Sequence, residues 1–181
     1  SVDKAWQVTT GRPDVVLAIL DSGLDWSDAG AMNDLAAKVH LNAAELPLPE
    51  ATSNGYDRNQ DGVFDVRDYR ADGTHAQDSR VSDLNANGIV DPEDLIRAFS
   101  DGSDADANGY VDDIAGWDFH EDDNDPFDDV HYGHGTGEAE DSGAEAANGG
   151  GVGTAPSSTF IPIKVADSFV SDINDFARGV V

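Results

Sequence analysis

Cysteine is absent from the 181 residues of this chain, and basic side chains are scarce. Without cysteine there is no disulfide framework, no thiolate metal ligand and no cysteine nucleophile. No apolar run approaches the ~18 residues that cross a membrane, so we expect no membrane span. Lys and Arg number 10 against 37 Asp and Glu, which gives a formal net charge of -27. Such a chain repels nucleic acids and anionic lipids, so cations are its expected partners and nucleic acids are not.

Both ends of the sequence also lack features. The N-terminal SVDKAW has no start Met, basic stretch or apolar leader segment. At the other end, the pattern predicts a helix with Ser171 as its N-cap, and this pattern is still apolar at Val180 and Val181. We therefore expect the chain to be part of a longer protein.

Aspartate is what the chain has in excess. There are 30 Asp and only 7 Glu, and 20 of the Asp lie between Asp57 and Asp129. A salt-adapted surface uses both acids, whereas Asp mixed with Gly and Asn forms turns that surround a cation with oxygen atoms. Calcium is therefore the expected cofactor. A salt-adapted acidic surface remains the alternative for part of the charge.

The hydrophobic pattern alternates between strands and helices outside this Asp-rich region. Strands are predicted at residues 15–20, 116–119 and 159–165, and helices at 3–8, 134–147 and from 171 onward. Because no hairpin signal separates them, the sequence predicts an α/β fold with a doubly wound, mostly parallel sheet covered on both faces. Residues 46–115 show only brief apolar islands, so we expect cation binding to organise them.

Two segments of the Asp-rich region repeat the ligand spacing of an EF-hand-type calcium loop. Residues 57–68 and 83–94 place oxygen-bearing side chains at loop positions 1, 3, 5, 9 and 12, with Gly at position 6. Position 7 offers a backbone carbonyl, and Asp at position 12 resembles dockerin-like loops more than sensor proteins. Solvated Asp-Gly turns are the alternative. The predicted ligands are Asp57, Asn59, Asp61, Val63, Asp65 and Asp68 in the first loop, and Asp83, Asn85, Asn87, Ile89, Asp91 and Asp94 in the second.

A third segment begins in the same way but is incomplete. Ala115 stands where the closing ligand belongs, so the site needs Asp113 or a group elsewhere in the chain. The predicted ligands are Asp104, Asp106, Asn108, Tyr110, Asp112 and Asp113. The acidic run at residues 121–129 is less patterned. Two interpretations remain for it: an exposed acidic turn, or a role in metal binding or charge screening.

Two short segments carry candidate catalytic residues. Asp21 directly follows the predicted strand at 15–20, and ligand sites of α/β sheets collect at that edge. His134 lies between two glycines where a helix is predicted to begin. A buried carboxylate that holds an imidazole in one tautomer is the arrangement that activates a serine nucleophile. Ser22 has no nucleophile context, and we assign it to the turn after the strand.

Several segments, in this order, resemble the subtilisin-like serine peptidases: AWQVTTGRPDVVLAILDSGLD, NGYVDDIAGWDF, GHGT and VGTAPSSTFIPIKV. The resemblance implies that residues 1–181 are the N-terminal part of a peptidase domain with a doubly wound, mostly parallel sheet. It also implies that Asp21 is the triad aspartate and His134 the general base. Residues 46–103 then form an inserted calcium-binding region, and residues 165–169 line the substrate groove. The implied protein is secreted or at the cell surface, acts on proteins or peptides, and has a possible propeptide.

The sequence departs from that family in two places. The Gly-Thr-Ser motif of the nucleophile and the oxyanion-hole asparagine do not occur, and an acidic GEAEDSGAEAANGG follows GHGT. Two hypotheses therefore stand. In the first, the chain is part of a secreted, calcium-stabilised serine endopeptidase whose Ser lies beyond residue 181. In the second, it is an inactive peptidase-like scaffold that serves as a calcium-dependent binding or adhesion module.

Overall fold

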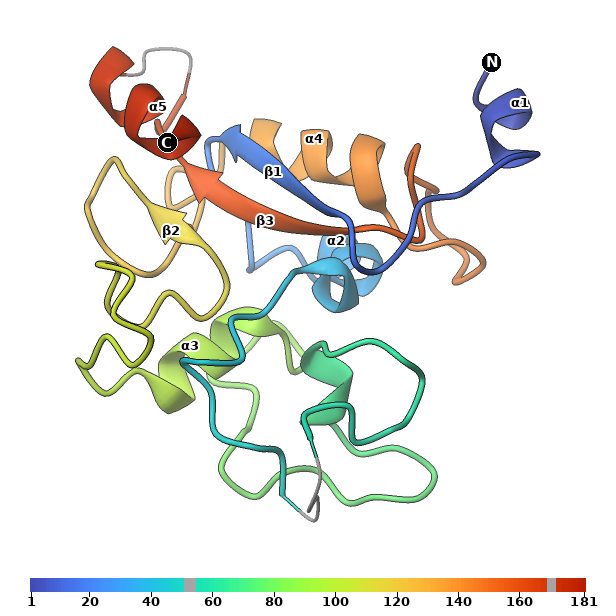
Figure 1. The fold of residues 1–181 in the computed structure, drawn as a ribbon, viewed down its shortest axis with the longest axis horizontal. Coiled ribbons are helices and arrows are strands. Elements are labelled where there is room, and N and C mark those ends of the chain that lie inside the picture. Colours follow the sequence, from blue (N-terminus) through green and yellow to red (C-terminus); the bar gives the residue numbers. More distant parts are fainter. Residues whose placement is uncertain (51–54, 169–171) are drawn as a thin grey trace.

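Three parallel strands form the central sheet. The computed structural model describes residues 1–50, 55–168 and 172–181. Strand β3 (Thr159–Lys164) lies between β1 (Val16–Asp21) and the short β2 (Trp117–Asp118), as Figure 1 shows. In this register Asp21 pairs with Lys164, so both strands end at the same edge. The mixed architecture confirms the predicted α/β class.

One face of the sheet carries the hydrophobic core. Leu17 and Phe160 pack there against helices α2 (Ala29–Leu35) and α4 (His134–Gly143). Helix α4 approaches closely, because a Cβ at Gly143 would lie 3.3 Å from the Phe160 ring. Side chains alternate along each strand, so every second residue of β1 and β3 points away from this core.

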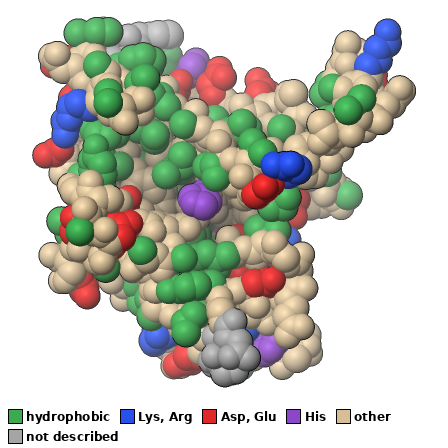
Figure 2. All heavy atoms as spheres, viewed as in Figure 1, with side chains coloured by type: hydrophobic (Ala, Val, Ile, Leu, Met, Phe, Trp, Pro, Cys, Tyr) green, Lys and Arg blue, Asp and Glu red, His purple; other side chains and the backbone are tan. Residues whose placement is uncertain are grey.

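Among the described residues, those that cover the opposite face lie near the carboxyl ends of the strands. Helix α5 (Ile173–Val180) packs there, with Gly179 close to Leu20 and Ile163. At the other end of β1, Val16 is 39% exposed, and hydrophobic side chains lie open over the sheet in Figure 2. Within the described residues, the predicted cover on both faces is therefore present only near the carboxyl ends of the strands. A helix of 8 residues spans only about 12 Å and cannot cover the sheet.

The helix ends differ from the predicted ones by a few residues. Helix α1 is Val2–Trp6, and α4 ends at Gly143 because Ala144 leaves the helical conformation with ψ 140°. The N-cap of α5 is Asp172, whose carboxylate accepts the N–H of Asn174. Ser171, the predicted N-cap, lies outside the described residues. None of the described helices is long and apolar enough to cross a membrane.

The described residues of the segment 46–103 lie below the sheet in Figure 1 and include helix α3 (Pro92–Phe99). Short 3-10 turns occur before and within this segment, at Ala36–Lys38 and Val66–Asp68. Besides the cation binding that the sequence predicts, the segment has apolar packing of its own. Tyr69 and Leu95 are fully buried, and the Tyr69 ring lies 5.7 Å from that of Phe99.

Candidate active site and metal-binding loops

The fold brings Asp21 and His134 together across 113 residues of sequence. Asp21 is the last residue of β1, and His134 is the first residue of α4. The Nδ1 atom of His134 lies 2.8 Å and 2.9 Å from the two carboxylate oxygens of Asp21. A carboxylate that accepts from Nδ1–H leaves Nε2 as the free nitrogen of the imidazole.

Small residues allow the strand end and the helix start to meet. A Cβ at Gly135 would lie 2.3 Å from the carbonyl oxygen of Gly23, so no larger residue fits there. The hydroxyl of Ser22 is buried and accepts the N–H of Gly135 at 3.1 Å. The structure thus places Ser22 in the strand-end turn, where its oxygen joins β1 to α4.

Asp128 fixes the turn that precedes His134. Its side chain is fully buried and accepts the N–H groups of Tyr132 at 3.0 Å and Gly133 at 2.6 Å. It also accepts the hydroxyl of Ser22 at 3.4 Å. Sequence reasoning did not single out Asp128, because nothing in the acidic run at 121–129 distinguishes it from its neighbours. Its position near GHGT was the only available signal.

A second carboxylate–imidazole pair ties the same two segments together. The Nδ1 atom of His131 lies 2.9 Å from Asp25 Oδ2, and this hydrogen bond raises the pKa of the exposed His131 imidazole. The N–H of Asp25 in turn donates to the Thr136 hydroxyl at 2.9 Å. Residues 21–25 and 131–136 are therefore linked on both sides of the Asp21–His134 contact.

A pocket of about 240 Å³ opens beside this contact. Asp21 and His134 form part of its wall, and Leu20, Val165 and Phe176 supply apolar surface. Ala166 and Ser168 also line it, so described residues of the segment 165–169 lie at this pocket. Phe169, the last residue of that prediction, lies outside the described residues.

The charge of His134 is set by its two acidic neighbours. The hydrogen bond that His134 donates to Asp21, and then the negative charge of Asp21, raise the pKa of the imidazole, with a smaller contribution from Glu138. Glu138 Oε1 lies 3.9 Å from the Nε2 atom. About half of the His134 side chain is exposed, so the ring exchanges protons with solvent. In its neutral form the imidazole of this pair could accept a proton at Nε2.

The two complete Asp-rich loops adopt the same turn. In each, the position 1 carboxylate, from Asp57 or Asp83, accepts the N–H groups of positions 5 and 6. The position 12 carboxylate, from Asp68 or Asp94, accepts the N–H groups of positions 2 and 3. Side chains at position 5 accept the N–H of Val63, Ile89 and, in the third loop, Tyr110. The structure therefore gathers the predicted side-chain ligands at positions 1, 5 and 12 of each complete loop into one turn.

Loop positions 9 and 12 have a second task in both complete loops. Asp91 is the N-cap of α3 and Asp94 its N3 residue, and the two form a reciprocal capping box. Asp65 and Asp68 do the same for the 3-10 turn that follows the first loop. The short side chain of Asp suits this geometry, because it reaches back to the N-cap N–H over one turn.

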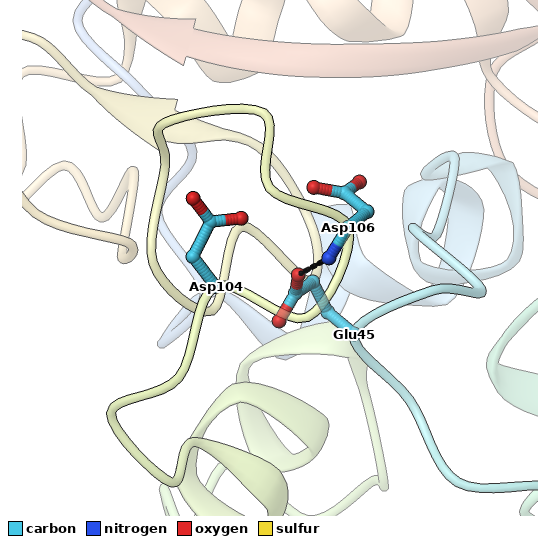
Figure 3. Close-up of side chains that lie close together, drawn as sticks. All are labelled: Glu45, Asp104 and Asp106. Atoms are coloured by element: carbon cyan, nitrogen blue, oxygen red, sulfur yellow. Dashed lines mark hydrogen bonds between the residues drawn. The ribbon is translucent and has the colours of Figure 1, made fainter.

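The third loop receives its closing carboxylate from outside. Glu45 Oε1 accepts the N–H groups of Ala105 at 2.8 Å and Asp106 at 3.2 Å, which are loop positions 2 and 3. Figure 3 shows Glu45 beside the loop that carries Asp104 and Asp106. Carboxylate oxygens of these three residues lie within 4.8 Å of one another, so they could hold a metal ion. Local spacing could not reveal Glu45, because it lies 60 residues before Ala105.

At the end of the third loop, two adjacent predicted ligands have carboxylates that point to different partners. Asp113 accepts the side-chain amides of Asn108 at 3.0 Å and Asn42 at 2.7 Å, so it faces the loop. Asp112 has a left-handed φ of 57°, and its carboxylate instead accepts the N–H groups of Asp101 and Gly102. The structure brings Asp113 to the loop and directs Asp112 away from it.

Several acids of the complete loops are buried, which disfavours their ionised form. A bound cation would offset this free-energy cost. Burial raises the pKa of Asp65 and of Asp91 to about 6. Within the described residues, Asp65 Oδ2 has no hydrogen-bond partner, and its nearest cation is Arg67 Nε at 3.3 Å. An oxygen-only donor set with buried carboxylates fits a hard divalent cation such as calcium.

Neither a comparison with models of protein families nor a comparison with curated proteins finds a match for this chain. The functional conclusion therefore rests on the residues and their geometry.

Proposed function

We propose that Asp21 and His134 are two members of a Ser-His-Asp peptidase triad on a subtilisin-like, doubly wound scaffold. The observation that carries this proposal is the Asp21–His134 contact, with Nδ1 of the imidazole 2.8 Å from the carboxylate at the carboxyl end of β1. The adjoining pocket supports it, since the pair lies in its wall. The serine would come from a part of the protein outside these 181 residues.

In this proposal each of the two residues has one task. Asp21 accepts the Nδ1–H bond, holds the ring in one tautomer and stabilises the imidazolium when it forms. His134 Nε2 takes the proton of the serine hydroxyl and returns it to the leaving amine. Among the described residues, no serine hydroxyl bonds to Nε2, and the nearby Ser22 hydroxyl is committed to Asp128 and Gly135.

We further propose that the three Asp-rich loops bind calcium and stabilise the fold. In the complete loops the predicted ligands would hold the ion, and in the third loop Glu45 would act with Asp104, Asp106 and Asp113. Calcium supplies positive charge to buried carboxylates, and a ligand that binds only the folded state stabilises that state. Millimolar calcium is available outside the cell, which favours a secreted protein.

The test uses the parent protein that contains this chain, with calcium present. Hydrolysis of an unstructured protein substrate should be lost in His134→Ala. The matched control is His75→Ala, which removes another imidazole with an aspartate at 3.0 Å but leaves the pocket intact. Full activity in His134→Ala would contradict the proposal. No activity in a folded, calcium-loaded parent would favour the second hypothesis, a binding or adhesion module.

A further inference from the structure

Glu138 belongs to the acidic stretch that follows GHGT, and its carboxylate lies near the Nε2 atom of His134. The two residues are four positions apart on α4, so their side chains lie on one face of the helix. Glu138 Oε1 is 3.9 Å from His134 Nε2, and the side chains are 54% and 48% exposed. This pair lies in the N-terminal half of α4, and ions from solvent can reach it because both side chains are about half exposed.

The imidazole is already oriented as a metal ligand. Asp21 accepts from Nδ1 at 2.8 Å, which directs the Nε2 lone pair away from β1. The Tyr132 ring lies nearly parallel to the imidazole, with an interplanar angle of 15° and 5.8 Å between the ring centroids. A carboxylate on the far nitrogen is the usual support of a metal-bound histidine, since it fixes the tautomer and raises the basicity of the ligand.

We propose that His134 Nε2 and the Glu138 carboxylate together bind a transition-metal cation of the Zn²⁺ class, with water completing the shell. Zinc takes nitrogen and oxygen ligands at about 2.0–2.2 Å, so a tetrahedral ion brings the two atoms to roughly 3.4 Å from each other. The exposed Glu138 side chain closes the remaining gap by rotation. Imidazole favours zinc, whereas calcium prefers oxygen ligands, so this site is distinct in chemistry from the Asp-rich loops.

Binding would have a direct consequence for the proposed peptidase. A cation on Nε2 occupies the lone pair that accepts the serine proton, so zinc would act as a reversible inhibitor of the general base. This consequence rests on the proposed function, whereas zinc binding itself does not. The two can therefore fail separately.

The experiment titrates ZnCl₂ into the 181-residue chain at saturating calcium, so that the oxygen-rich loops are filled. Nitrogen-15 NMR of the histidine side chains locates the ion, and calorimetry gives its affinity. We expect a stoichiometric shift of His134 Nε2. Glu138→Gln and Asp21→Asn should each weaken zinc binding by about 10-fold or more. Asp141→Asn, an exposed acid on the same helix, is the control and should change affinity less than twofold.

Three results would overturn the inference. The first is a zinc shift at His75, His120 or His131 with His134 unaffected. The second is equal affinity in Glu138→Gln and the unaltered chain, and Glu138→Asp provides a second substitution at this exposed position. The third is no binding at all. Zinc binding at His134 in a chain whose parent has no peptidase activity would instead contradict the proposed function and leave the zinc site standing.

Discussion

At the scale of single residues, backbone N–H groups hold the key carboxylates in place. Asp128 accepts two of them beside the active-site candidate, and Glu45 accepts two at the third loop. Such bonds satisfy a buried anion without a basic partner, which matters in a chain with only 10 Lys and Arg. Substitution of Asp128 or Glu45 should therefore disturb the turn whose N–H groups that carboxylate accepts.

The first prediction concerns the protonation of His134. Asp21 and, to a smaller extent, Glu138 favour the imidazolium and raise its pKa. Asp21→Asn should therefore lower the pKa of His134 more than Glu138→Gln does, and Asp141→Asn should leave it unchanged. NMR titration of the His134 ring measures these values. An unchanged pKa in Asp21→Asn would show that the two side chains do not interact in solution.

The second prediction concerns the buried acids of the two complete loops. Asp65 and Asp91 have a folded pKa of about 6, raised from 3.8 by burial. Ionised, they destabilise the metal-free fold, and this penalty disappears as the pH falls through 6 toward 4. The metal-free chain should therefore be more stable to urea at pH 5.5 than at pH 7.5. Calcium needs the ionised acids, so its stabilisation should be weaker at pH 5.5.

The control is the double variant Asp65→Asn and Asp91→Asn. In this variant, lowering the pH from 7.5 to 5.5 should stabilise the metal-free chain by a smaller amount. The pKa values of the exposed imidazoles of His131 and His134 are also raised in the folded chain, so their protonation likewise stabilises the fold as the pH falls. Part of the increase in stability should therefore remain in the double variant. A metal-free chain that loses stability between pH 7.5 and pH 5.5 would contradict this assignment.

At the scale of elements, sequence reasoning located the sheet but not all the helices. The β-branched run at 15–20 and the run at 159–165 predicted β1 and β3 to within one residue. Helix α3 was not predicted, because its residues were assigned to a calcium loop and brief apolar islands. In the structure Asp91 and Asp94 serve as its capping box, and Pro92 occupies the first turn.

Local spacing also cannot determine how the third loop is closed. The contribution of Glu45 depends on the tertiary fold, which brings Ala105 and Asp106 back to Glu45. The left-handed backbone at Asp112 likewise turns one of two adjacent acids away. The contact between Asp21 and His134 could be anticipated from the resemblance, whereas the approach of Glu138 to Nε2 required the helix geometry.

The third prediction separates the ligands of this loop. Glu45→Gln and Asp113→Asn should each remove one equivalent of bound calcium, because both carboxylates face the loop. Asp112→Asn should retain that equivalent, since its side chain lies against Asp101 and Gly102. Calorimetric stoichiometry measures the difference. Loss of the equivalent in Asp112→Asn, with retention in Asp113→Asn, would reverse the assignment.

At the scale of the whole molecule, the Asp-rich region is in direct contact with the segment that follows β1. The side-chain amide of Asn87 donates to the carbonyl of Trp26 at 2.7 Å. Trp26 is fully buried, and its indole N–H donates to Asp125 at 3.0 Å. The second loop is therefore connected through Trp26 to the stretch that begins at Asp21.

The fourth prediction is that calcium stabilises the entire chain and not only the loops. Each filled site adds about 2.7 kcal/mol at a free calcium concentration 100-fold above its dissociation constant. Chelation should lower the urea midpoint monitored by tryptophan fluorescence and by the far-UV signal together, since the loops and the sheet share one core. Magnesium at the same concentration should not restore it, because it needs a tighter octahedral shell. Separate transitions for the two probes would show that the regions unfold independently.

The most direct test of the account compares the two carboxylate–imidazole pairs in the parent protein. The rate of reaction with a serine-directed phosphonate, followed by intact mass, is measured in Asp21→Asn and Asp25→Asn at saturating calcium. Asp21 holds His134 beside the pocket, whereas Asp25 holds the exposed His131. The account predicts that Asp21→Asn slows labelling by orders of magnitude while Asp25→Asn keeps most of the rate. Equal rates in the two variants would contradict a role for the Asp21–His134 pair in activating a serine.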